Sequence, residues 1–120
     1  MQKKFIIIIF IIICFYLYFK DEVFKEKTIL IGTSVPLSGT INSWGKAVFS
    51  GVNSYFKFAN ENNLIDNKKI EFLLYDDKYE PELTLENTKK LIYEKKVFAL
   101  FGFVGTPTVK RILPILYDED

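Results

Sequence analysis

Residues 28–35 read TILIGTSV, and this stretch decides the fold. Apolar and β-branched side chains fill it almost throughout, which is typical of a strand buried on both faces of a parallel sheet. Pro36, Ser38 and Gly39 follow and end the strand. From residue 43 to 60 the apolar side chains recur with helical spacing, so we expect a helix next. The apolar stripe of this helix consists of Val48, Val52, Tyr55, Phe56 and Ala59.

The same order of strand and helix returns twice along the chain. Residues 69–75 (KIEFLLY) and 97–101 (VFALF) are predicted strands, and residues 81–96 and 106–117 are predicted helices. Alternation with short joints indicates right-handed βαβ units on a parallel sheet, so the predicted fold is α/β with three layers. Because a fourth strand would be expected next, we expect residues 28–120 to be a truncated part of a larger lobe.

The composition excludes several kinds of chemistry. The 120 residues include no His and one Cys, so the usual ligands for zinc, haem or an iron–sulfur cluster are missing. A Ser-His or Cys-His couple and a disulfide are excluded as well. The 16 basic and 15 acidic side chains give a formal net charge of +1, which predicts no binding to nucleic acid. We expect no enzyme activity, no metal and no cofactor.

The amino terminus has the layout of an export signal or a membrane anchor. Lys3 and Lys4 precede an uncharged apolar segment, residues 5–19, and charged residues follow it at positions 20–22. A helix of this length spans roughly 22 Å, less than the ~30 Å hydrocarbon core, which favours a signal peptide. The small residues of a cleavage site are missing, which favours an uncleaved anchor. Residues 1–27 are therefore predicted to be one or the other, with the rest of the chain periplasmic or otherwise extracytoplasmic.

Cys14 raises the alternative of a lipid-modified cysteine. The residue before such a cysteine is normally small, whereas Ile13 is large, and the apolar run continues past Cys14. A plain buried thiol is the favoured interpretation.

Three loops are candidate ligand sites, because open α/β sheets bind ligands outside the carboxyl ends of their strands. These loops are residues 35–43, 76–80 and 102–106. The third leads into a helix whose free amides could hold an anion, although a plain connection would have the same residues.

Part of the first loop is similar to a phosphate-binding loop. Gly39, Gly45 and Lys46 stand in the order of that motif, but five residues separate the glycines where the motif has four. Ala47 also occupies the position of the required hydroxyl. Nucleotide binding is therefore not predicted, and a small exported α/β enzyme remains only a lesser alternative.

Two further features allow a structural and a functional interpretation. Asp76 and Asp77 could serve a metal or acid–base chemistry, but no third ligand follows at a suitable spacing, so a turn-capping role is favoured. Trp44 begins the first predicted helix, and periodicity alone favours a core or staple residue there.

Together these segments resemble the first lobe of the Leu/Ile/Val-binding family of periplasmic substrate-binding proteins, the receptors of branched-chain amino-acid ABC importers. The resemblance rests on ILIGTSVPLSGTINSWGKAVFSGVNSYFKFAN, KIEFLLYDDKYEPELTLENTKKLI and VFALFGFVGTPT. It implies the first lobe of a type I periplasmic-binding-protein fold, which closes on an amino acid or another small carboxylate by hinge motion. It also implies an ABC importer permease as partner.

The resemblance also implies ligand-binding residues. Trp44 would touch the side chain of the ligand, and Thr106 would bind its carboxylate, with Phe103 and Gly105 in the same loop. The leading hypothesis is a non-enzymatic, extracytoplasmic solute-binding component of an ABC importer. The alternative is the ligand-sensing domain of a signalling receptor that is anchored in the membrane through residues 5–19.

Overall fold

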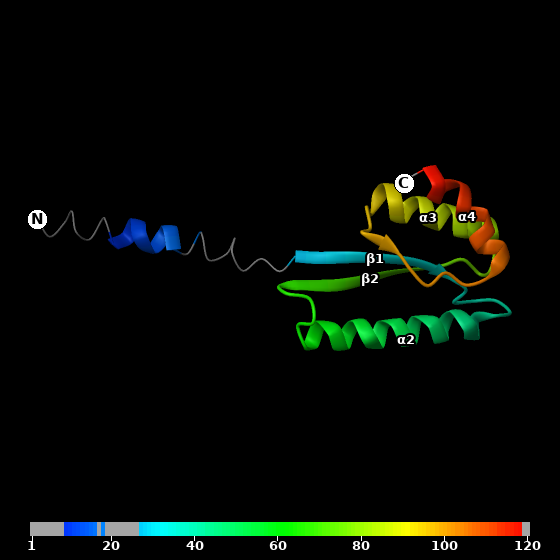
Figure 1. Ribbon diagram of the computed structural model, residues 1–120, viewed down its shortest axis with the longest axis horizontal. Helices are drawn as coiled ribbons and strands as arrows, with labels where there is room; N and C mark the ends of the chain where they lie inside the picture. Colours follow the sequence, from blue (N-terminus) through cyan, green and yellow to red (C-terminus); the bar gives the residue numbers. More distant parts are fainter. Residues whose placement is uncertain (1–8, 17, 19–26, 119–120) are drawn as a thin grey trace, which may run out of the picture.

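The computed structural model describes residues 9–16, 18 and 27–118. From residue 27 onward a parallel three-stranded sheet of order β2-β1-β3 lies between helical layers (Figure 1). Along the chain the elements are β1 (Lys27–Val35), α2 (Asn42–Glu61), β2 (Lys68–Asp76), α3 (Pro81–Lys89), the π-helical turn η1 (Lys90–Glu94), β3 (Ala99–Leu100) and α4 (Thr106–Asp118). The predicted three-layer α/β fold is confirmed.

The two faces of β1 meet different helices. Figure 1 shows α2 on one face of the sheet and α3 and α4 on the other. On the α2 face, Ile31 pairs with Phe72 of β2, whose ring centroid lies 6.2 Å from that of Phe49 and 5.4 Å from that of Phe56. These aromatic contacts attach α2 to the sheet.

On the opposite face of the sheet, a side chain packs closely against the backbone of β1. A Cβ atom at Gly32 would lie only 2.7 Å from Cδ2 of Leu91, so glycine lets the fully buried Leu91 pack directly on β1. Leu91 belongs to η1, where the helix predicted for residues 81–96 changes from α-helical to π-helical geometry.

The third strand is shorter than predicted. Only Ala99 and Leu100 form a ladder with β1, although the expected strand covers residues 97–101. The amides of Phe98 and Phe101 still donate to the carbonyls of Leu30 and Gly32, at 2.8 and 2.9 Å. Hydrogen bonds to β1 therefore set the position of residues 98–101, although only two of them form the ladder.

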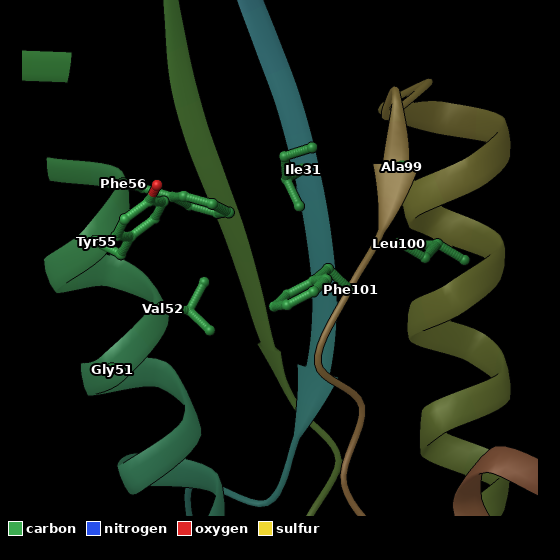
Figure 2. Close-up of a pocket in the computed structure, with 8 residues that line it drawn as sticks. All are labelled: Ile31, Gly51, Val52, Tyr55, Phe56, Ala99, Leu100 and Phe101. Atoms are coloured by element: carbon green, nitrogen blue, oxygen red, sulfur yellow. The ribbon is translucent and has the colours of Figure 1, made fainter. Parts of the chain in front are cut away.

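An apolar groove of about 450 Å³ lies between α2 and β3 (Figure 2). Its lining consists of Ile31, Gly51, Val52, Tyr55, Phe56, Ala99, Leu100 and Phe101. Tyr55, which helical periodicity assigns to the buried stripe of α2, is 62% exposed here, so that expectation is wrong. The reason is that α2 packs mainly on β2 and leaves the sheet toward β3 open, where Tyr55 lines the groove.

Near the amino terminus, residues 9–16 and 18 are helical and their side chains are exposed where described. Within the described part of the chain, no helix has the length and apolar character needed to cross a bilayer. Cys14 is a free thiol that is exposed, so the interpretation of a buried thiol is wrong for the described residues. Residues 1–8, 17 and 19–26 lie outside the described residues, so a signal peptide or anchor at residues 1–27 stays a prediction.

The protein buries polar side chains beside its apolar core. Between β1, the end of β2 and α3, the hydroxyls of Ser34 and Thr84 donate to Oδ2 of Asp77 at 3.0 and 3.2 Å, and all three residues are buried. Thr33 is equally buried, yet its hydroxyl has no hydrogen-bond partner among the described residues. The hydroxyl of Thr84 therefore has a hydrogen-bond partner in the folded protein, whereas the hydroxyl of Thr33 has none among the described residues.

This difference yields a matched pair of variants. Thr33→Val removes an unsatisfied hydroxyl and should raise the free energy of unfolding by about 1 kcal/mol. Thr84→Val removes a hydroxyl that is shared between Oδ2 of the buried Asp77 (3.2 Å) and the carbonyl of Glu80 (3.1 Å), and it should lower the free energy of unfolding by about 1–2 kcal/mol. Urea unfolding of the full chain measures both, and changes of the same sign would contradict this account of the core.

Candidate functional site

The loops that follow the three strands lie at one edge of the sheet. Residues 36–41 connect β1 to α2, residues 77–80 connect β2 to α3, and residues 101–105 connect β3 to α4. In Figure 1 these connections gather at the right-hand end of the strands. This is where parallel α/β sheets bind ligands.

Asp76, the last residue of β2, joins the first loop to the second. Its Oδ1 accepts hydrogen bonds from the amides of Leu37 (2.8 Å), Ser38 (3.3 Å) and Lys78 (2.9 Å), and its Oδ2 accepts one from the Ser38 hydroxyl (2.6 Å). Desolvation alone would raise the pKa of Asp76, but these hydrogen bonds outweigh it and lower the pKa to about 2. The contacts agree with the predicted structural role.

Asp77 stabilises the turn of the second loop from the interior of the protein. Besides its bonds from Ser34 and Thr84, it accepts the amide of Tyr79 on Oδ1 at 2.9 Å. Lys78 and Tyr79 both have left-handed backbone conformations, with φ of 53° and 67°. A buried, hydrogen-bonded carboxylate thus holds a turn that non-glycine residues rarely adopt. No cluster of three or more potential metal ligands occurs in the described part of the chain.

The hydrogen bonds of Asp76 predict acid sensitivity. Because its folded-state pKa lies below its ordinary value of 3.8, the stabilisation is complete above about pH 4 and disappears as the pH falls toward 2. Allowing for partial exposure, Asp76→Asn should cost ~1–2 kcal/mol of unfolding free energy near neutral pH.

The difference between wild type and Asp76→Asn should shrink as the pH falls from about 4 to 2, and unfolding at several pH values measures it. Asp66→Asn, in an exposed loop, is the control. A stability difference that does not depend on pH would show that the carboxylate charge is unimportant.

Trp44 lies at the edge of the site, and the adjacent Gly45 determines this position. A Cβ atom at Gly45 would lie 2.0 Å from the carbonyl oxygen of Pro36, so α2 can begin against the first loop only with glycine there. Trp44 is 68% exposed, and the interpretation of this residue as part of the core is wrong. Periodicity assigns a residue to a helical face, but at the helix end that face lies beyond the sheet.

The third loop rests on the second. Gly102 and Gly105 have φ of 75° and 102°, a region that L side chains rarely adopt. A Cβ atom at Gly105 would lie 2.2 Å from Cε2 of Tyr79, so the tyrosine ring packs directly on this glycine. The Thr108 hydroxyl donates to the carbonyls of Val104 and Gly105 at 2.6 and 2.7 Å, which joins the loop to the first turn of α4.

Two adjacent depressions open between these loops. The smaller, about 130 Å³, is lined by Ile41, Trp44, Tyr79, Val104 and Gly105. The wider, about 480 Å³, is lined by Trp44, Gly105, Thr106, Val109 and Lys110. Both share Trp44 and Gly105, so they form one continuous surface with an apolar end and an end that carries a cation and the amino terminus of α4.

Three of the four predicted site residues come together here. Trp44, Gly105 and Thr106 line the depressions, whereas Phe103 lines neither. Tyr79 and Lys110 were missed by sequence reasoning. Tyr79 belongs to the second strand-end loop, and Lys110 follows Thr106 by one helical turn, so the sequence places both residues near the candidate site. It does not show that their side chains line the depressions.

The fold and the site define a class: an α/β lobe that offers a ligand surface at the carboxyl edge of a parallel sheet. A family model described as periplasmic binding protein matches residues 28–120. The chain belongs to this family, and the predicted resemblance is confirmed. No curated protein matches the chain.

Solved structures agree with the family. A possible leucine/isoleucine/valine-binding protein from Rhodopirellula baltica is 32% identical, with a TM-score of 0.75 over 78% of this chain and 25% of its own. An ABC-transporter solute-binding protein from Rhodopseudomonas palustris, in complex with 3,4-dihydroxybenzoic acid, is 31% identical, with a TM-score of 0.68 over 76% of this chain and 24% of its own.

A third solved structure is the branched-chain amino-acid transporter substrate-binding protein from Streptococcus pneumoniae, in complex with isoleucine. It is 27% identical, with a TM-score of 0.72 over 77% of this chain and 26% of its own. The family and these neighbours are binding proteins. The chain spans about a quarter of the length of the structures that it matches.

Proposed function

We propose that this lobe is part of an extracytoplasmic solute-binding component of an ABC importer, which binds an amino acid or another small carboxylate. The observation that carries the proposal is the continuous surface at the carboxyl edge of the sheet, with an apolar end and a cationic end. The isoleucine and dihydroxybenzoate complexes of neighbouring proteins support the ligand class.

The cationic end suits a carboxylate. Thr106 is the first residue of α4, where the helix dipole is positive, and its exposed side chain offers a hydroxyl donor. Lys110 lies on the same depression and adds a formal positive charge. A ligand carboxylate placed here would meet both groups, while the apolar part of the ligand would lie toward Trp44.

The remaining parts of the proposal concern the whole protein. Export would be directed by residues 1–27, and the ligand-loaded protein would deliver its ligand to a membrane permease. Both rest on the family membership of residues 28–120 and on the apolar amino-terminal segment.

Thr106→Val tests the carboxylate contact. A hydrogen bond to a charged partner contributes about 1.5–3 kcal/mol, so the affinity of the full chain for isoleucine or benzoate should fall roughly ten- to a hundredfold. Calorimetric titration measures the affinity, and Thr28→Val, an exposed threonine at the start of β1, is the matched control. Affinities within twofold of wild type would refute the assignment of Thr106.

Trp44→Ala should have a different effect. It removes an apolar wall, so it should change the preference among ligand side groups more than the binding of the shared carboxylate. Titration against glycine, isoleucine and benzoate measures this preference. An equal loss of affinity for all three ligands would show that Trp44 does not contact the variable part of the ligand.

A further inference from the structure

Helices cover the two faces of the sheet unequally. Figure 1 shows α3 and α4 on one face and α2 alone on the other. Because α2 packs mainly on β2, the part of its face beside β3 stays open as the apolar groove between α2 and β3 (Figure 2). None of the residues that line this groove is charged, and Phe101 is 53% exposed. The groove therefore suits an apolar element, which would remove this surface from water.

Gly51 points to close approach by such an element. It lies in the interior of α2, where glycine is less favourable than almost any other residue, and it lines the groove. A Cβ atom at Gly51 would have no atom of a neighbouring element within 4 Å, whereas a Cβ atom at Gly32 or Gly45 would clash. Packing among the described residues therefore does not require glycine at position 51. A second helix that packs closely on α2 would require it.

The chain itself contains an apolar helix of suitable size. Residues 9–16 (IFIIICFY) are helical and uncharged, and all of them are exposed. The exposed fractions of Phe10, Ile11 and Ile12 are 68%, 60% and 60%. Eight helical residues span about 12 Å, and α2 rises about 8 Å from Gly51 to Phe56, so one face of the short helix matches the groove in length.

The connection to β1 is long enough for this helix to reach the groove of its own molecule. Residues 17–26 separate the helix from Lys27, and ten residues span at most about 33–36 Å. Ile31, which lines the groove, lies four strand residues beyond Lys27, roughly 13 Å away. A short connection also gives an effective concentration of about millimolar, which favours the chain's own helix over a second copy in dilute solution.

We propose that the helix of residues 9–16 docks in the groove between α2 and β3 when no bilayer is present. It would be a second helix on the α2 face, with its closest approach at Gly51 and its apolar side chains against Val52 and Phe101. The contact would shield the predicted export or anchor segment from water, and a bilayer would compete for the same segment. The inference is independent of the proposed function, because no residue of the groove lines the two depressions of the candidate ligand site.

Cys14 allows a test in the full chain, because it is the only cysteine and its thiol is exposed. A nitroxide spin label on this thiol broadens the amide signals of nearby residues in the ¹⁵N-labelled chain, and the chemically reduced label gives the reference intensities. In buffer without lipid, the amides of residues 51–56 and 99–101 should lose at least about half of their intensity if most molecules are docked. The amides of α3, on the opposite face of the sheet, should keep theirs.

Two variants of α2 make the test specific to the groove. Gly51→Asp places a carboxylate in the groove, and the open space around residue 51 accommodates it without a clash. It should restore the groove signals to within roughly a fifth of their reference intensities, because docking would bury an unpaired charge. Asn53→Asp adds a carboxylate to the same helix at an exposed position outside the groove, and it should leave the broadening unchanged.

A mixture of two chains identifies the molecule that supplies the helix. Spin-labelled chain without ¹⁵N is mixed with ¹⁵N chain that carries the reduced label, and the groove signals should keep their intensity. Broadening in this mixture would assign the groove to a second copy and would overturn the proposal. Intact groove signals in the spin-labelled wild type, or an equal response of the two aspartate variants, would overturn it as well.

Discussion

The site depends on the hydrogen bonds that the carboxylate of Asp76 accepts. It gathers the amides of Leu37, Ser38 and Lys78 and so holds two loops that follow different strands. The adjacent Asp77 points into the interior and binds hydroxyls from β1 and α3. Two neighbouring carboxylates therefore have separate structural tasks: one joins the loops at the surface, and the other attaches the turn to the core.

Close packing at two glycines adds to the hydrogen bonds of the two carboxylates in positioning the loops. Gly45 lets α2 start against the carbonyl of Pro36, which leaves Trp44 at the rim of the site, and Gly105 accepts the ring of Tyr79. Polar bonds and close approaches thus bring the three loops into one surface. Its apolar and cationic ends follow from which residues these contacts leave accessible, and this division is the physical basis of the proposed binding of a small carboxylate.

Much of the fold could be predicted from particular stretches of sequence. TILIGTSV and KIEFLLY predict β1 and β2 because buried parallel strands need apolar, β-branched residues. The short ladder of β3 could not be predicted, because pairing with β1 decides its length. Trp44, Gly105 and Thr106 were predicted together by resemblance, whereas the packing of Tyr79 on Gly105 joins loops distant in sequence, and no local pattern indicates such a contact.

The central claim is that ligands bind across the three strand-end loops. The most direct measurement is a titration of the ¹⁵N-labelled full chain with isoleucine, followed by amide chemical shifts. We expect the largest chemical-shift changes in residues 36–45, 77–80 and 102–110. These changes should saturate with isoleucine, and Thr106→Val should lower the affinity that they report. Changes centred on the groove around Val52 and Leu100, or no saturable change at all, would contradict the account.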